Sequence, residues 1–343
     1  MAKTLGAVFG VLIVVLCLPM GAGSAPLLFS PKRDVSDKHR GNTVEKSEHV
    51  SRDDTVRGVV KRPAFAGFSQ FIFPSDNRRV NGSMPLADID SLLPYHSQIK
   101  VETTVEVINF LIDETSQGLT VFYDFYSDRE KKMDPAKQAT GLFYFRGKPD
   151  APFAIVCPGG GFSYVGSIHE GFPQALELSR KGYNAFVLKY RVGSGLHATE
   201  DLAAALSFVF ENAMNLRVST DDYSLWGGSA GARMVASIGT HGAFAFGGSE
   251  LPKPATVVMA YTGHSEFAKN DPPTFVMVSD DDPIVHVPTV ERRVHAMRSV
   301  GVDVEYHKYR GAGHGFGLGI ETDAEGWMEN AIRFWEKYIR LQQ

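Results

Sequence analysis

Short apolar runs and amphipathic segments alternate along the chain from about residue 140 onward. The run FAIVC at 153–157 is apolar throughout, which is typical of a strand covered on both faces. Further strands are predicted at 142–145, 185–190, 223–226, 256–261, 274–279 and 303–309. Helices are predicted between them at 172–181, 199–212, 230–238, 290–300 and 324–339. This order predicts βαβ units, and therefore a mostly parallel sheet with helices on both faces.

The pattern is weaker before residue 140. Residues 101–112 are rich in β-branched side chains, and Gly118 marks a turn after them. The aromatic segment 119–126 (LTVFYDFY) alternates in part and predicts one more strand, which makes eight. We therefore expect a single α/β domain over residues 65–343.

The first 24 residues have the pattern of a secretory signal peptide. Lys3 precedes an apolar run from Leu5 to Leu18, and small residues follow, with cleavage expected after Ala22 or Ser24. An uncleaved membrane anchor is the alternative, although 14 apolar residues are few for a bilayer. The protein is thus expected to be secreted, and to meet a membrane only if this segment is retained.

Residues 25–64 are predicted to be a disordered linker or pro-segment. Apolar residues are sparse and without period between Pro31 and Arg62, and charged residues dominate. Lys61-Arg62 resembles a processing site, but Pro63 would hinder cleavage there.

The composition argues against a nucleic-acid partner and against a fold held by disulfide bonds. The 343 residues are 43% hydrophobic and 22% charged, with a net charge of −4, so no basic surface indicates a nucleic-acid partner. Of the two cysteines, Cys17 lies in the apolar leader and Cys157 in a predicted strand, which excludes a disulfide framework.

The strongest chemical signal is Gly227-Gly228-Ser229-Ala230-Gly231, between a predicted strand and a predicted helix. That is the context of a G-x-S-x-G nucleophile elbow, in which a sharp turn lifts the serine hydroxyl clear of the sheet. An incidental serine in a glycine-rich turn is the alternative. A second loop, Pro158-Gly159-Gly160-Gly161-Phe162, follows the FAIVC strand, where esterases carry an HGGG-type loop of oxyanion donors. Its glycines do not fit the patterns of nucleotide phosphate loops.

A base and an acid for the serine are found after the last two strands. His314 lies between glycines after the final strand and is preferred over His264 and His286 as the base. The acid comes from Asp280-Asp281-Asp282, of which Asp282 fits best because Ile284 and Val285 follow it. Turn formation and capping are the expected roles of the other two. The order Ser229, Asp282, His314 is that of α/β-hydrolases.

These residues carry a resemblance to α/β-hydrolase fold esterases, in the acetyl-esterase and acetylxylan-esterase-like branch near the hormone-sensitive lipase group. The resemblance covers about residues 99–338 and lies in CPGGGFSYVGSIHEGFP, YSLWGGSAGARM, VVMAYTGHSEF, VSDDDPIV and YRGAGHGFGLG. It implies backbone oxyanion donors at Gly160, Gly161 and Ala230, and it implies carbohydrate esterase activity for secreted members. The chain departs from HGGG by a proline, which leaves the substrate open.

Two further segments are candidates for substrate binding. Tyr164, His169 and Glu170 follow the oxyanion loop, and Tyr261 and His264 lie at the end of a strand, where open α/β sheets bind ligands. Local turn hydrogen bonding is the alternative for both segments.

The sequence thus predicts a secreted serine carboxylesterase for short-acyl esters, with acetyl esters and carbohydrate esters as the expected substrates and with no metal or cofactor. A peptidase of the prolyl-oligopeptidase type and a non-catalytic binding protein are the alternatives. Only residues 262–273 separate two neighbouring strands, which predicts a minimal cap and an open site unless the N-terminal segment covers it. The oligomeric state stays open.

Overall fold

A computed structural model describes residues 49–340 except 75 and 77–79. The predicted signal peptide and most of the predicted linker lie outside these residues. Ser47–Gln343 forms one compact unit. No helix in the described part of the chain is long and apolar enough to cross a membrane.

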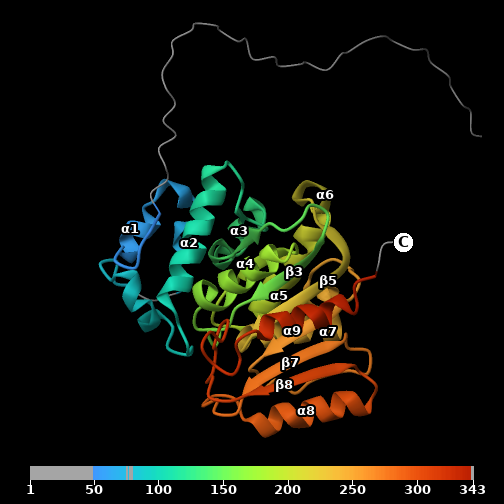
Figure 1. The fold of residues 1–343 in the computed structure, drawn as a ribbon. Coiled ribbons are helices and arrows are strands. Elements are labelled where there is room, and N and C mark those ends of the chain that lie inside the picture. The colour runs from blue at the N-terminus through green and yellow to red at the C-terminus, as the bar shows by residue number, and fades with distance from the viewer. Residues whose placement is uncertain (1–48, 75, 77–79, 341–343) are drawn as a thin grey trace, which may run out of the picture. The chain divides into compact units, whose positions relative to one another are not determined.

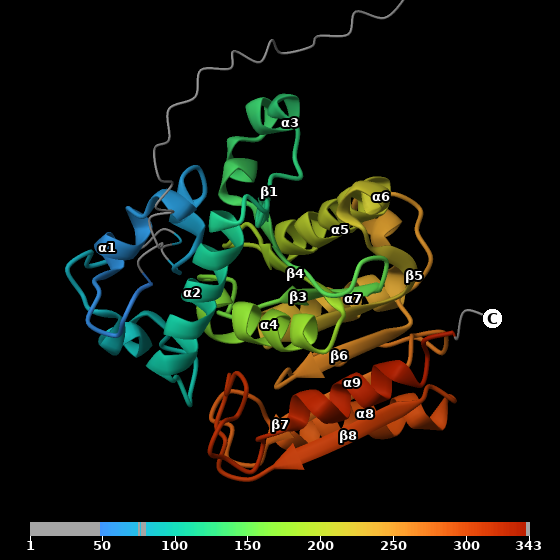
Figure 2. The same ribbon diagram turned by 45° about the horizontal axis from the view of Figure 1, so that its top comes forward.

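Eight strands form a single sheet in the order β1-β2-β4-β3-β5-β6-β7-β8 (Figures 1 and 2). The strands are β1 (Phe122–Tyr123), β2 (Gly141–Phe145), β3 (Pro152–Cys157), β4 (Asn184–Lys189), β5 (Ser219–Gly228), β6 (Thr256–Ala260), β7 (Thr274–Ser279) and β8 (Val304–Tyr309). β2 is antiparallel to both β1 and β4, and all other pairs are parallel. The predicted fold class, an eight-stranded and mostly parallel sheet, is confirmed.

Helices cover both faces of the sheet because strand residues alternate between two buried clusters. In β2, Phe143 and Phe145 join the larger cluster, whereas Leu142 and Tyr144 join the second. The helices are α1 (Val56–Val60), α2 (Val101–Ser116), α3 (Asp128–Met133), α4 (Phe172–Arg180), α5 (Gly195–Glu211), α6 (Ala213–Leu216), α7 (Ala230–His241), α8 (Val287–Ser299) and α9 (Trp327–Glu336). Residues of α2, α4 and α9 pack in the larger cluster, those of α5 and α7 in the second, and α8 covers β7 and β8.

The described segment before β1 corrects the sequence prediction at one point and assigns an element where the sequence predicted none. The linker was expected to end at residue 64, but residues 49–64 are folded, because Val50, Val56 and Val59 are buried in the larger cluster. The β-branched segment 101–112 belongs to helix α2. Its buried positions are spaced by three and four residues, which matches a helical face: Thr104, Val107, Ile108, Leu111 and Ile112.

The first strand is shorter than predicted, since only two residues of 119–126 pair with β2. Tyr126 instead turns its hydroxyl toward Asp201 of α5, at 2.7 Å. Between β6 and β7 the chain contains no helix, so the cap is minimal, as expected.

Candidate active site

Ser229 lies at the sharp turn between β5 and α7. Its backbone has φ 49° and ψ −110°, a strained conformation for a residue with a side chain. A β-carbon at Gly231 would overlap the carbonyl oxygen of Cys157 in β3, so only glycine allows the helix to start this close to the sheet. These local constraints produce the elbow that the sequence predicted.

Ser229, His314 and Asp282 lie in hydrogen-bonding contact although they come from three separate loops. His314 Nε2 is 2.9 Å from Ser229 Oγ, and His314 Nδ1 is 2.8 Å from Asp282 Oδ2. The side chain of Asp282 is fully buried, and that of His314 is only 3% exposed. Because a carboxylate accepts the Nδ1 proton, Nε2 is left to accept the proton of the serine hydroxyl.

The three consecutive aspartates have different partners, so assigning the catalytic acid one residue too early would name a residue with another role. Asp282 Oδ1 accepts the backbone N–H groups of Ile284 and Val285, each at 2.8 Å, so its other oxygen is aimed at His314. Asp281 accepts the N–H of Gly313, and Asp280 accepts that of Gly311. The first two aspartates thus hold the histidine loop, and the third contacts the histidine itself.

The glycine loop after β3 presents free backbone donors beside Ser229. Gly160 has φ 131°, and a β-carbon there would overlap the carbonyl oxygen of Tyr164, so the loop requires glycine at this position. The N–H groups of Gly160 and Gly161 donate to no atom of the described residues. Ala230 is the first residue of α7, where helix geometry leaves the N–H unpaired. The three predicted donors therefore remain available for an oxyanion.

Glu170 is a buried carboxylate directly behind this loop. Its Oε2 accepts the N–H of Gly159 at 2.5 Å, and its Oε1 lies 2.9 Å from His96 Nε2. A β-carbon added at Gly159 would lie 3.0 Å from both Glu170 Oε2 and Ser229 Cβ, so the carboxylate adjoins the elbow. Burial alone would raise the pKa of Glu170, but the facing His96 and the N–H of Gly159 lower it to about 2.

Tyr164 and His169 belong to the same buried layer. The Tyr164 hydroxyl is 2.8 Å from His96 Nδ1, and His169 Nε2 donates to the carbonyl of Gly315 in the histidine loop. Burial, and next the neighbouring His96, lower the pKa of His169 to about 4, so this imidazole is neutral. Tyr164, His169 and Glu170 were predicted to bind substrate. The structure instead places them in the interior, where they support the catalytic loops.

Tyr261 and His264 follow β6. The Tyr261 ring packs edge-on against His314, with centroids 5.2 Å apart, and forms part of the floor of a pocket beside Ser229. His264 does not line that pocket. Burial, and next Arg293 and Arg233, lower the pKa of His264 to about 4. Of the two residues, only Tyr261 keeps the predicted place in the substrate pocket.

The sequence analysis missed a contribution from residues 95–97. Ser97 Oγ lies 2.7 Å from the carbonyl oxygen of Ala312 and 2.9 Å from that of His314. Tyr95 stacks on Tyr164, with ring centroids 5.6 Å apart. No short motif marks these residues, because they act through partners more than 60 positions away in the chain.

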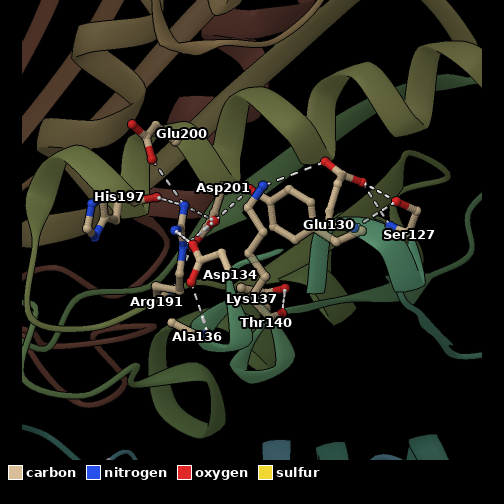
Figure 3. A network of polar contacts seen from close by, with 11 residues as sticks. Ser127, Glu130, Asp134, Ala136, Lys137, Thr140, Arg191, His197, Glu200 and Asp201 are labelled. Carbon is tan, nitrogen blue, oxygen red and sulfur yellow. Dashed lines mark hydrogen bonds and ion pairs between the residues drawn. The ribbon is translucent and has the colours of Figure 1, made fainter. Parts of the chain in front are cut away.

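A second polar network holds the chain after β4 (Figure 3). Arg191 donates through Nε to Asp201, at 2.9 Å, and through Nη1 to Asp134, at 2.7 Å. In the turn that follows, the backbone N–H of Gly193 donates to the carbonyl oxygen of Phe162 in the glycine loop. The segment that this network holds therefore also contacts the oxyanion loop, and no motif in the sequence indicated it.

The pocket beside Ser229 has a volume of about 440 Å³ and opens to solvent. Its lining comes from the glycine loop, the start of α7, the segment after β6 and the start of α8: Gly161, Phe162, Ser229, Ala230, Arg233, Tyr261, Thr262, Gly263, Ile284, Val285, His286 and Thr289. Among the described residues, no cluster of three or more His, Cys, Asp or Glu side chains is arranged to hold a metal ion.

Comparison with known proteins agrees with this geometry. Residues 145–252 match the BD-FAE family, and residues 250–342 match the prolyl oligopeptidase family. An acetylxylan esterase of Xylanibacter ruminicola is 24% identical over 232 residues, covering 56% of this chain and 48% of that protein. The chain thus spans about half the length of this relative.

Solved structures share the fold. An acetyl ester-xyloside bifunctional hydrolase of Caldicellulosiruptor lactoaceticus is 22% identical with a TM-score of 0.56, over 64% of this chain and 97% of that one. An alpha/beta hydrolase from a deep-sea metagenome library of the Medee basin is 24% identical with a TM-score of 0.51, over 59% and 93%. Fold, motif order and these similarities identify the chain as an α/β-hydrolase-fold protein similar to esterases of the acetylxylan esterase kind.

Proposed function

We propose that this chain is a secreted serine carboxylesterase that hydrolyses short-acyl, chiefly acetyl, esters, with carbohydrate esters as its natural substrates. The observation that carries the proposal is the contact of Ser229 Oγ with His314 Nε2, beside backbone N–H groups that have no partner among the described residues. The similarity to an acetylxylan esterase supports the acyl group, and the apolar leader in the sequence supports export.

In the proposed reaction Ser229 Oγ attacks the ester carbonyl while His314 accepts its proton. The developing oxyanion is bound by the N–H groups of Gly160, Gly161 and Ala230. Asp282 keeps Nδ1 protonated and stabilises the imidazolium, which then protonates the leaving alcohol. Water hydrolyses the acyl-enzyme by the same route in reverse, so no cofactor is required.

Labelling with a fluorophosphonate probe tests the nucleophile. The wild-type protein should be labelled at Ser229, and the Ser229→Ala variant should not be labelled under the same conditions. Circular dichroism of both proteins serves as the folding control. A folded wild-type protein that stays unlabelled would remove the basis for any serine hydrolase, and would leave the non-catalytic scaffold as the remaining interpretation.

A peptidase is the second candidate function, because residues 250–342 match the prolyl oligopeptidase family. Among the described residues before β2, helices and turns predominate and β1 has only two residues, so this part of the chain forms no β-propeller. Hydrolysis of proline-containing peptide anilides at rates equal to those of acetyl esters would favour the peptidase.

The open pocket predicts a preference for short acyl groups. No helix covers Ser229 between β6 and β7, so a long acyl chain would remain largely in water and gain little from burial. We expect kcat/KM for an acetyl ester to exceed that for the decanoyl ester of the same alcohol. A tenfold preference for decanoyl, about 1.4 kcal/mol in the transition state, would contradict the open site.

A further inference from the structure

The pocket beside Ser229 is positively charged. Arg233 of α7 and His286 at the start of α8 both line it, and none of its lining residues is an aspartate or glutamate. Asp282 lies close in sequence, but its side chain is fully buried against His314. A substrate in this pocket therefore meets the guanidinium of Arg233 and an imidazole, and no carboxylate of a lining residue.

The contacts of the described residues give no structural reason for the arginine at position 233. Its side chain is exposed, and it forms no ion pair with any described residue. Glu266, an acidic neighbour of this region, is engaged with His241 at 2.9 Å. Arg233 also lies in the first turn of α7, where the helix dipole disfavours a cation. Its position thus does not serve the stability of the helix.

A second guanidinium contacts a residue that lines the pocket. Arg292 Nη2 of α8 donates to Thr289 Oγ1 at 3.0 Å, and Thr289 lines the pocket. His286 Nδ1 lies 3.3 Å from the same hydroxyl. The neighbouring His264 responds to the same charges: burial is the main cause that lowers its pKa, and the positive charges of Arg293 and Arg233 lower it further.

We propose that this pocket selects esters that carry a carboxylate near the scissile bond, with Arg233 as the residue that recognises it. A guanidinium binds a carboxylate through two parallel hydrogen bonds, which makes arginine well suited to the task. The inference rests on the proposed esterase function and narrows its substrate class to anionic esters, with the charge on either the alcohol or the acyl part. The cationic wall also attracts such substrates before they bind.

Matched pairs of anionic and neutral esters test this selection. For the alcohol side the pair is 4-acetoxybenzoate and 4-acetoxybenzamide; for the acyl side it is mono(4-nitrophenyl) glutarate and 4-nitrophenyl valerate. The measured quantity is the ratio of kcat/KM for the anionic ester to that for its neutral partner. In Arg233→Gln we expect this ratio to fall at least tenfold in one pair, equivalent to about 1.4 kcal/mol. The affected pair identifies the side of the ester that carries the charge.

Further variants separate recognition from general damage. Arg233→Glu should lower the ratio further, whereas Arg233→Lys should give an intermediate ratio, because it keeps the charge without the planar fork. Arg129→Gln removes the same charge from an exposed position on α3 and should leave both ratios unchanged. Added salt should reduce the anionic advantage of the wild type.

Two results overturn the inference in distinguishable ways. If Ser229→Ala abolishes hydrolysis but Arg233→Gln and Arg233→Glu leave both ratios within twofold of wild type, the esterase function stands and anion selection is wrong. If Ser229→Ala hydrolyses the esters as fast as wild type, the proposed function itself fails, and this inference fails with it.

Discussion

Replacing Ser229 with alanine should lower kcat for an acetyl ester by about 10⁵-fold or more while KM changes little. The hydroxyl forms the new covalent bond, so its loss removes the whole acyl-enzyme route and leaves only the oxyanion donors and binding. His314→Ala should cause a loss of similar size, because the serine is a weak nucleophile without its base. Initial rates over a range of substrate concentrations, at a protein concentration high enough to detect slow turnover, are the measurement.

The double variant Ser229→Ala/His314→Ala gives the sharper test. Residues that act as one unit show non-additive losses, so the double variant should be no slower than either single variant. Losses that multiply would mean that the two side chains act independently, contrary to their 2.9 Å contact. Thermal unfolding of each variant shows whether the fold is retained.

The second large effect is expected at Glu170. Glu170→Ala should lower the free energy of unfolding at neutral pH by about 2–5 kcal/mol, because the N–H of Gly159 and the buried ring of His96 both lose the carboxylate that faces them. Glu170→Gln should cost less, since an amide oxygen still accepts the N–H of Gly159 and the amide group still fills the space beside His96. Urea unfolding curves of the three proteins give these free energies.

The pH dependence of stability follows from the direction of the shift. The pKa of Glu170 is about 2 in the fold, below the usual 4.5, so its contribution is present above pH 4.5 and is lost as the pH falls toward 2. The wild type should lose stability over that interval, and Glu170→Gln should lose less. The matched control is Glu211→Gln, at the exposed end of α5. Equal acid sensitivity in wild type and Glu170→Gln would contradict the assignment.

Glu170 should also affect catalysis, because it holds the first N–H of the oxyanion loop. Loss of one oxyanion donor typically costs about 10²–10³ in kcat, and Glu170→Ala should approach the lower figure through displacement of Gly160 and Gly161. A role in stability alone would leave kcat unchanged in protein that remains folded. The split between kcat and KM at a temperature below the unfolding transition decides between these roles.

The fold could be predicted from the sequence because its main signals are local. Strand β3 is a continuous apolar run, and the elbow around Ser229 combines a strand, a strained turn and a helix within a dozen residues. Asp282 and His314 each follow their own strand in the order typical of α/β-hydrolases. His314 contacts Asp282 across 32 positions of sequence and Ser229 across 85, yet the motifs were enough to find all three residues.

The supporting layer could not be predicted in the same way. The roles of His96, Ser97 and Glu170 depend on which side chains meet in three dimensions, and no spacing along the chain encodes that. Helix α2 was hard to identify for a different reason. Its β-branched residues favour strands intrinsically, but burial of one helical face outweighs that preference.

The hydrogen bonds from Ser97 to the histidine loop join residues 215 and 217 positions apart. Contacts that close loops of this length form late in folding, because the entropy of closure is lost before the contact can compensate for it. We therefore expect the loop that carries His314 to reach its final geometry only after the segment around residue 97 has docked. The family matches begin at residue 145 and so do not include Ser97. The geometry of the catalytic histidine loop therefore depends on a segment that lies outside both matched regions.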